Sequence, residues 1–203
     1  MLFWICFWIL FLPITIFFPT KVIGKKNFPK RKKQNVIISC NHMSNVDGPL
    51  IDIKFIKKIH YLAKIEMFKN KFFGFIMRKL GGIPVDRSKA DIGAIKKTLK
   101  VLNEKKNVGI FPQGTRKEEG EIDVATVKNG ISMFSLRTGT PVLPMAIVRK
   151  PKVFRRNLIM VGELIFPDME RSRDKDYAEE FTTIIVDKMN ELLHNGRERL
   201  KKK

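Results

Sequence analysis

Residues 36–47, VIISCNHMSNVD, decide the fold. The run Val36-Ile37-Ile38-Ser39 is short, apolar and mostly β-branched, which is typical of a strand buried on both faces. The strand pattern ends at Asn41-His42, and Ser44 to Asp47 has the capping-box spacing of a helix N-terminus. This stretch therefore predicts a buried strand, a turn and a helix in direct succession.

Short apolar runs alternate with helical patterns along the rest of the chain. We expect strands at 61–63, 83–85, 108–111, 141–148 and 158–161, and helices at 65–80, 89–104, 127–137 and 174–194. Gly81-Gly82 is expected to end the 65–80 helix. Such alternation indicates the α/β class, with a largely parallel central sheet flanked by helices.

The first twenty residues, MLFWICFWILFLPITIFFPT, contain no charged side chain. Twenty helical residues span about 30 Å, the thickness of the hydrocarbon core of a bilayer. A cleaved signal peptide has basic residues before its apolar run, whereas Lys21, Lys25 and Lys26 follow it here. We therefore expect an uncleaved, hydrophobic membrane-binding helical segment.

The geometry of this segment stays open. Pro13 and Pro19 are expected to break the helix. A bent segment lying in the membrane interface is thus an alternative to a straight span. A buried core helix is the third interpretation, and the lack of a polar face argues against it.

The charge of the chain is large and uneven. There are 40 Lys and Arg against 20 Asp and Glu, a formal net charge of +20. Residues 21–33, 54–79 and 197–203 carry net charges of +7, +7 and +4, while 80–196 is nearly balanced. Because Lys outnumbers Arg and is less suited to reading bases, no nucleic acid is expected as a partner. A membrane surface is favoured instead.

The chain divides into three parts on this basis. Residues 1–20 are expected to form the hydrophobic membrane anchor, 21–34 a basic linker and 35–203 one folded domain. The positive-inside rule places the domain on the cytoplasmic side of the cell membrane. Lys30, Arg31, Lys32 and Lys33 would face anionic headgroups, and Cys6 and Cys40 would be reduced.

The sharpest chemical signal is His42 followed five residues later by Asp47. If His42 lies in the turn and Asp47 in the first helical turn, the carboxylate can fold back onto one ring nitrogen. The other nitrogen is then free to take a proton. This pair makes two thirds of a hydrolase triad, and a hydroxyl of the substrate could supply the nucleophile. Asp47 as a helix cap alone is the alternative.

Two further blocks carry arginines after short strands. Phe111-Pro112-Gln113-Gly114-Thr115-Arg116 offers a glycine for close approach, a hydroxyl and a guanidinium. Gly81-Gly82-Ile83-Pro84-Val85-Asp86-Arg87 brings the second arginine. Either arginine alone would be a solvated surface charge. Together at strand ends, Arg87 and Arg116 predict a shared anion site.

Other candidate side chains have plainer interpretations. Cys40 could be a nucleophile, but it lies at an apolar strand end where a core cysteine is the commoner case. His60 and His194 are expected at the surface or an edge. Residues 65–80 interleave phenylalanines with lysines, which suits a membrane surface, a domain core or a channel for an acyl chain.

Four blocks together resemble those of the membrane glycerolipid acyltransferases. NHMSNVD resembles their His-x4-Asp motif, and GGIPVDR is similar to their second block. FPQGTR is similar to their FPEGTR block, and Thr140-Pro141-Val142-Leu143-Pro144 to their fourth. The match covers roughly residues 35–150. Closest in form are the small bacterial 1-acyl-glycerol-3-phosphate acyltransferases, the PlsC-like enzymes, which also begin with a hydrophobic membrane-binding segment.

The resemblance implies transfer of a fatty acyl group to the second-carbon hydroxyl of lysophosphatidic acid, giving phosphatidic acid. Acyl carrier protein or coenzyme A would carry the acyl group as a thioester, and no metal or other cofactor is implied. His42 would be the general base and Asp47 its orienting partner. The substrate phosphate would be bound by residues of the other blocks, with Lys128 carried over most weakly: Arg87, Arg116, Thr115, Gly114, Gln113 and Lys128.

One position departs from the family pattern, because Gln113 replaces the glutamate of the third block. A role in hydrogen-bonding acceptor hydroxyls survives this change, whereas a role that needs a carboxylate does not. Two rival functions remain at this level. The chain could acylate glycerol 3-phosphate or another lysophospholipid, or it could be a non-catalytic basic module that binds membranes or nucleic acid.

Overall fold

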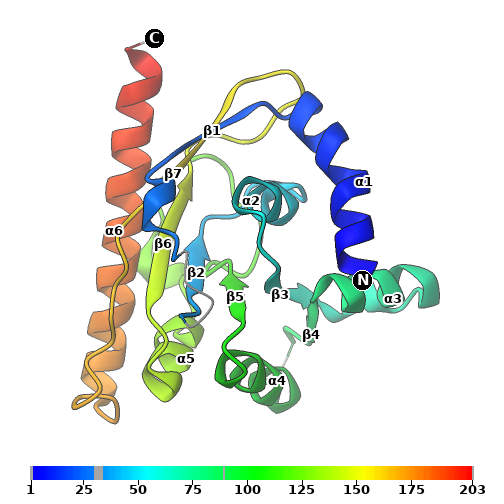
Figure 1. Ribbon diagram of the computed structural model, residues 1–203. Helices are drawn as coiled ribbons and strands as arrows, with labels where there is room; N and C mark the ends of the chain where they lie inside the picture. Colours follow the sequence, from blue (N-terminus) through cyan, green and yellow to red (C-terminus); the bar gives the residue numbers. More distant parts are fainter. Residues whose placement is uncertain (1, 30–33, 89, 203) are drawn as a thin grey trace.

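A seven-stranded sheet forms the centre of the computed structural model, which describes residues 2–29, 34–88 and 90–202 (Figure 1). Its strands follow the order β1-β7-β6-β2-β5-β3-β4. Their bounds are β1 (Thr20–Ile23), β2 (Ile37–Cys40), β3 (Ile59–Lys64), β4 (Ile83–Val85), β5 (Asn107–Ile110), β6 (Val142–Ile147) and β7 (Asn157–Val161).

Six α-helices and three short 3-10 helices are described around this sheet. The α-helices are α1 (Leu2–Phe17), α2 (Asp47–Phe55), α3 (Lys71–Leu80), α4 (Ile92–Asn103), α5 (Gly130–Thr138) and α6 (Lys175–Lys201). The 3-10 helices are η1 (Lys25–Asn27), η2 (Ile65–Phe68) and η3 (Val124–Thr126). The predicted α/β class with a mostly parallel sheet and flanking helices is confirmed.

The strand directions bring the sequence blocks that carry His42, Arg87 and Arg116 to one edge of the sheet. Strands β6, β2, β5, β3 and β4 are mutually parallel, whereas β7 is antiparallel to β6 and β1 runs parallel to β7. The carboxyl ends of the five parallel strands therefore meet at the same edge. In open α/β sheets this edge is where ligands bind.

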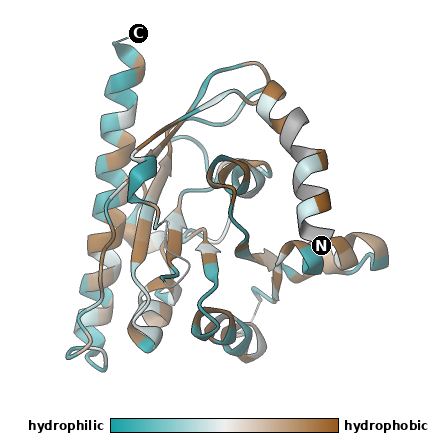
Figure 2. Ribbon diagram, viewed as in Figure 1, coloured by the Kyte–Doolittle hydropathy of each residue, from teal (hydrophilic) through white to brown (hydrophobic). Residues whose placement is uncertain are grey.

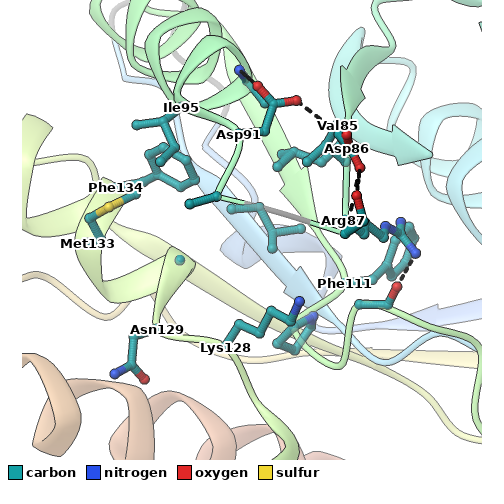
Figure 3. A pocket seen from close by; sticks show the side chains of 18 residues that line it. Val85, Asp86, Arg87, Asp91, Ile95, Phe111, Lys128, Asn129, Met133 and Phe134 are labelled. Atoms are coloured by element: carbon teal, nitrogen blue, oxygen red, sulfur yellow. Dashed lines mark hydrogen bonds between the residues drawn. The ribbon is translucent and has the colours of Figure 1, made fainter. Parts of the chain in front are cut away.

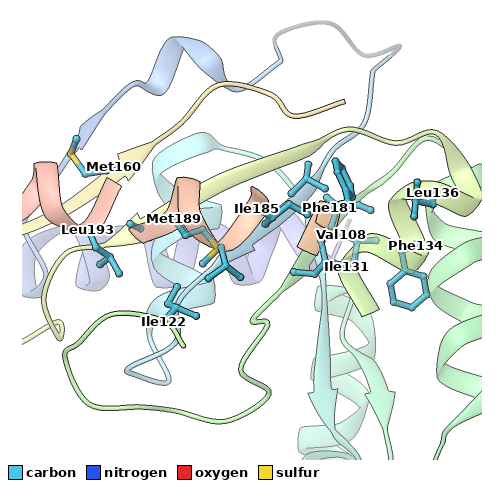
Figure 4. Packing of buried hydrophobic residues seen from close by; sticks show 14 of the residues in the cluster. Val108, Ile122, Ile131, Phe134, Leu136, Met160, Phe181, Ile185, Met189 and Leu193 are labelled. Carbon is cyan, nitrogen blue, oxygen red and sulfur yellow. The ribbon is translucent and has the colours of Figure 1, made fainter. Parts of the chain in front are cut away.

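The central strand buries both of its faces, as its apolar run predicted. Ile37 packs with α4, α5 and α6 side chains in one cluster, and Ile38 packs with α2 in the other. Figure 4 shows the first cluster, in which Phe181, Ile185 and Met189 of α6 lie near Ile131 of α5. A strand covered on both faces has no solvent-facing positions, which explains its continuous apolar sequence.

The expected helix over 65–80 is two elements. Residues 65–68 form η2, and α3 begins only at Lys71. Asn70 caps α3 by accepting a hydrogen bond from the backbone N–H of Phe73, and such a cap competes with helix continuation. The predicted stop at Gly81 is confirmed, with φ of 98°.

The N-terminal part differs from the expectation in two respects. Pro13 lies inside α1 and does not break it, and Pro19 follows its end. Residues 21–23, which we expected to belong to the basic linker, form β1 together with Thr20, the last residue of the expected anchor, and β1 pairs with β7. The expected contact of Lys30, Arg31, Lys32 and Lys33 with headgroups concerns residues outside the described ranges. No helix among the described residues combines the length and the apolarity that crossing a membrane requires.

Gly196 provides a test of how closely α6 packs on the sheet. A Cβ at this position would lie 2.3 Å from Cγ2 of Val148 and 3.1 Å from Cγ of Met160. In most helix interiors Gly→Ala raises the free energy of unfolding by about 1 kcal/mol. Here Gly196→Ala should instead lower it by about 1 to 3 kcal/mol through overpacking, as measured by urea denaturation. Gly120→Ala is the control, because its Cβ meets no atom within 4 Å; equal effects would contradict the packing.

Candidate functional site

The turn after β2 is built around one carboxylate oxygen. Oδ2 of Asp47 lies 2.8 Å from Nδ1 of His42. The same oxygen accepts hydrogen bonds of 2.7 Å from the backbone N–H groups of Met43 and Ser44. Asp47 is the first residue of α2 and its side chain is fully buried, whereas that of His42 is 19% exposed. The predicted contact between His42 and Asp47 is therefore present.

This arrangement defines the tautomer of His42. Oδ2 of Asp47 already accepts two backbone hydrogen bonds, so it acts as an acceptor toward the ring as well. Nδ1 of His42 must then carry the hydrogen. The neutral ring consequently presents Nε2 as its basic nitrogen, in the orientation that a general base requires.

Aromatic rings hold the other side of the imidazole. The ring of His42 stacks on Phe111 with a centroid distance of 4.1 Å and an interplanar angle of 18°. Phe111 in turn lies nearly parallel to Tyr61, at 5.7 Å and 10°. Gly109 leaves room for this column, since a Cβ there would lie 2.2 Å from Cε1 of Tyr61. The ring plane of His42 is thus fixed by residues of β5 and β3.

Helix α2 supports both contacts of His42. Besides supplying Asp47, it provides the Gly48 carbonyl and Oδ1 of Asp52, each 3.3 Å from the Tyr61 hydroxyl. Burial raises the pKa of Asp52 well above its usual value, and the hydrogen bond from Tyr61 opposes this rise only in part. Burial and the nearby Asp52 also raise the pKa of Tyr61. Both shifts favour the protonated forms of these two side chains.

The loop after β5 is hydrogen-bonded directly to the turn that carries His42. The backbone N–H of Lys117 donates to the carbonyl of His42 over 2.8 Å. His42 and Gln113 line a common hollow of about 280 Å³, together with Lys117. Gln113 therefore borders the same hollow as His42 and brings to it an amide, which can hydrogen-bond but carries no charge.

A larger cavity of about 600 Å³ lies beside β4 and β5, with α4 and α5 around it. Figure 3 shows Arg87 and Lys128 at one side of this cavity and Ile95, Met133 and Phe134 at the other. A guanidinium of Arg87 donates to the carbonyl of Gly114, which leaves further donors for a ligand. The cavity therefore combines two cations with an apolar wall.

The two arginines do not line one pocket among the described residues. Arg116 is exposed and borders a separate hollow of about 460 Å³ with Lys117 and Lys150. Thr115 is exposed as well. The cation that lines the larger cavity together with Arg87 is Lys128, which the sequence had suggested most weakly. Gly114 has φ of 68°, and Arg116 follows it two residues later on the exposed part of the loop.

The structure gives two other candidate reactive side chains, Cys40 and His60, plain structural roles. Cys40 is buried, and burial together with the charge of Asp47 raises the pKa of its thiol well above the usual value. A protonated, inaccessible thiol is a poor nucleophile. His60 is not at the site: Nδ1 of His60 is 3.1 Å from the Gly81 carbonyl, which joins β3 to the end of α3. Among the described residues, no three His, Cys, Asp or Glu side chains gather as metal ligands would.

Sequence reasoning missed the supporting residues of His42. Tyr61 and Asp52 carried no recognisable pattern, because an aromatic residue in a strand and an acid on a helix are both common. Phe111 was seen only as part of a block. The contact among the three rings requires the lateral pairing of β2, β5 and β3, which no local pattern indicates.

Comparisons with known proteins agree with this geometry. A family described as Acyltransferase matches residues 19–148. The 1-acyl-sn-glycerol-3-phosphate acyltransferase of Borreliella burgdorferi is 31% identical over 172 residues, covering 81% of this chain and 67% of that protein. The enzyme of that name from Bacillus subtilis is 36% identical over 127 residues, covering 62% of this chain. The chain spans about three fifths, 61%, of this second relative.

The fold is also that of a solved structure. The crystal structure of the 1-acyl-sn-glycerophosphate acyltransferase PlsC from Thermotoga maritima superposes with a TM-score of 0.66 at 24% sequence identity. The match covers 86% of this chain and 72% of that one. This likeness shows a common α/β fold.

The buried carboxyl of Asp52 predicts a pH dependence of stability. Above pH about 4 an unfolded aspartate releases its proton, whereas folded Asp52 retains it. The free energy of unfolding therefore falls as pH rises from about 4 until folded Asp52 ionises. Asp52→Asn keeps a hydrogen-bond acceptor for Tyr61 and removes this loss. The variant should gain stability over the native protein as pH rises from 4 to 7, as measured by urea denaturation; parallel curves would contradict the pKa shift.

Proposed function

Because the chain belongs to the Acyltransferase family, we propose that it transfers a fatty acyl group to the second-carbon hydroxyl of lysophosphatidic acid, forming phosphatidic acid. The donor would be a thioester of acyl carrier protein or coenzyme A. The hydrogen-bonded pair of His42 and Asp47 beside a cationic, apolar-walled cavity carries this proposal. The names of the relatives from Borreliella burgdorferi and Bacillus subtilis support the choice of acceptor.

The proposed reaction uses Nε2 of His42 as the base. This nitrogen takes the proton of the acceptor hydroxyl as the hydroxyl oxygen attacks the thioester carbonyl. The new C–O bond forms, the C–S bond breaks, and the imidazolium returns its proton to the leaving thiolate. Asp47 accepts the hydrogen bond from Nδ1 throughout and stabilises the imidazolium charge that forms. No protein nucleophile is needed in this scheme.

We assign the acceptor phosphate to Arg87 and Lys128. Both border the larger cavity, and the carbonyl of Gly114 orients the guanidinium of Arg87. A guanidinium and an ammonium suit a phosphate dianion, and the apolar wall suits an acyl chain. Gln113 would hydrogen-bond an acceptor hydroxyl near His42. Thr115 and Arg116, which lie outside this cavity, would act from the loop beside it.

We also propose that α1 attaches the chain to the cell membrane, with the α/β domain on the cytoplasmic side. Lysines 21, 25 and 26 follow α1 directly, as the positive-inside rule expects of a cytoplasmic flank. The proposed division into an anchor over 1–20 and a domain over 35–203 is kept, with β1 added to the sheet of the domain. Membrane lipid is then both the partner and the source of the acceptor.

The first test is acyl transfer itself. The protein should convert lysophosphatidic acid to phosphatidic acid with an acyl thioester as donor, and His42→Ala should lower kcat by about 100-fold or more. The measurement is incorporation of a labelled acyl chain, with acyl carrier protein and coenzyme A thioesters compared. His194→Ala is the matched control, because His194 is exposed on α6. Full activity of His42→Ala, or no turnover of any acceptor by the native protein, would refute the proposal.

The second test concerns the acceptor phosphate. Arg87→Ala should raise KM for lysophosphatidic acid by about 10-fold to 100-fold, because one charge-assisted hydrogen bond is lost. The value of kcat should change far less, because in this proposal Arg87 binds the phosphate and touches neither the reacting hydroxyl nor the thioester carbonyl. Arg173→Ala, an exposed arginine before α6, serves as control. Equal KM values for Arg87→Ala and Arg173→Ala would exclude Arg87 as a phosphate ligand. A panel with glycerol 3-phosphate and other lysophospholipids identifies the preferred acceptor.

A further inference from the structure

We propose that the chain docks on an anionic lipid bilayer through three segments that meet on one side of the domain: α1, residues 65–80, and residues 149–156. We call this surface the docking face. The inference rests on the proposed function only in that the acceptor is a membrane lipid. It goes beyond an N-terminal anchor, because two of the three segments belong to the α/β domain itself.

The first domain segment is η2 with α3. Phe72, Phe73 and Phe75 are 75%, 46% and 48% exposed, and Ile65 and Met67 are 42% and 40% exposed. In α3 the residue that is buried is Gly74, which excludes the expectation that the phenylalanines of α3 face the core. They do not line the larger cavity either. Exposed apolar side chains clustered in this way mark a contact surface.

The second domain segment is the loop between β6 and β7. Val153 and Phe154 are 52% and 71% exposed at its tip. Phe154 has φ of 58°, a left-handed conformation that is a true outlier for a bulky residue. Its backbone N–H donates to the carbonyl of Phe17 over 2.7 Å, and the two rings lie 5.5 Å apart. The loop thus holds an aromatic ring outward at a conformational cost, against the end of α1.

Helix α1 joins the two domain segments into one face. It contacts α3, and its last residue, Phe17, contacts the 149–156 loop. Figure 1 shows α1 running along the domain from α3 to this loop. Ile14 packs on the domain, while Trp8 and Ile9 are 61% and 67% exposed. A helix packed lengthwise on the domain presents its outer side to a surface, as an interfacial helix does.

The charges around the docking face favour anionic lipid as its occupant. Residues 64–79 contain five basic side chains and one acid, and residues 149–156 contain five basic side chains and no acid. Figure 2 shows hydrophilic and hydrophobic residues mixed along α3. Each Lys or Arg near an anionic membrane surface contributes about 1 kcal/mol. An acidic protein would use the same charges, but it would not require a series of exposed phenylalanine rings. Rings enter the acyl boundary while lysines meet phosphates.

The experiment measures binding of the full chain to vesicles by flotation. Vesicles of phosphatidylcholine mixed with phosphatidylglycerol are compared with vesicles of phosphatidylcholine alone. Two docking variants are tested: the double variant Phe72→Asp with Phe75→Asp, and separately Phe154→Asp. Each should weaken binding to the anionic vesicles by about 10-fold or more, because an apolar ring that would be buried in the bilayer is lost. Phe166→Asp is the matched control. Phe166 is 61% exposed and belongs to the segment between β7 and α6, which Figure 1 shows beside α6, away from α1 and α3.

The outcomes separate the docking face from the proposed function. A midpoint of thermal unfolding equal to that of the native protein establishes that each variant is folded. In detergent micelles the docking variants should keep the kcat of the native protein, because the acceptor is then supplied without a bilayer. Vesicle binding by both docking variants equal to that of Phe166→Asp would overturn the docking face, whatever the activity. So would equal binding of the native protein to neutral and anionic vesicles. Absence of turnover in micelles would instead refute the acyltransferase proposal and leave the vesicle result standing.

Discussion

Three hydrogen bonds to Oδ2 of Asp47 organise the turn at the carboxyl end of the central strand. Two of them come from backbone N–H groups, so the same oxygen that orients His42 also shapes the chain from strand to helix. A buried carboxylate is costly unless it is fully hydrogen-bonded, and the other oxygen, Oδ1, has no partner among the described residues. Because all three contacts end on Oδ2 of Asp47, the geometry of the turn and the orientation of the His42 ring depend on one another.

The sheet makes that local arrangement into a site. Because β2, β5 and β4 are parallel members of one sheet, the His42 turn, the 111–116 loop and Arg87 follow strands that end at the same edge. Helix α2 then supports the His42 ring in two ways. Asp47 contacts the edge of the ring directly. Asp52 accepts a hydrogen bond from Tyr61, which stacks on Phe111, and Phe111 stacks on the face of the His42 ring. Such preorganisation is what the proposed general-base role of His42 would require.

The net charge of +20 has different uses in different places. In the nearly balanced region from 80 to 196, Arg87 and Lys128 border a cavity with an apolar wall. Around α3 and the 149–156 loop, basic residues surround exposed aromatic rings. The first arrangement suits a single phosphate ester and the second a surface of many phosphates. If both proposals hold, this separation lets substrate binding and membrane attachment vary independently.

Local sequence patterns predicted much of this structure. The β-branched run before Asn41, the spacing from His42 to Asp47 and the glycine at 81 indicated a strand, a His–Asp contact and a helix end, because each depends on neighbours in the chain. The limits of that reasoning are equally physical. Pro13 is accommodated in α1, residues 20–23 pair with β7, and Asn70 divides one expected helix in two. Three outcomes were decided by the tertiary structure alone. Lys128 and not Arg116 lines the cavity of Arg87. Tyr61 and Phe111 support His42, and the phenylalanines of α3 face outward. These outcomes depend on strand pairing and on packing between segments distant in sequence, and a periodic pattern shows which residues share a side of a helix but not what that side contacts.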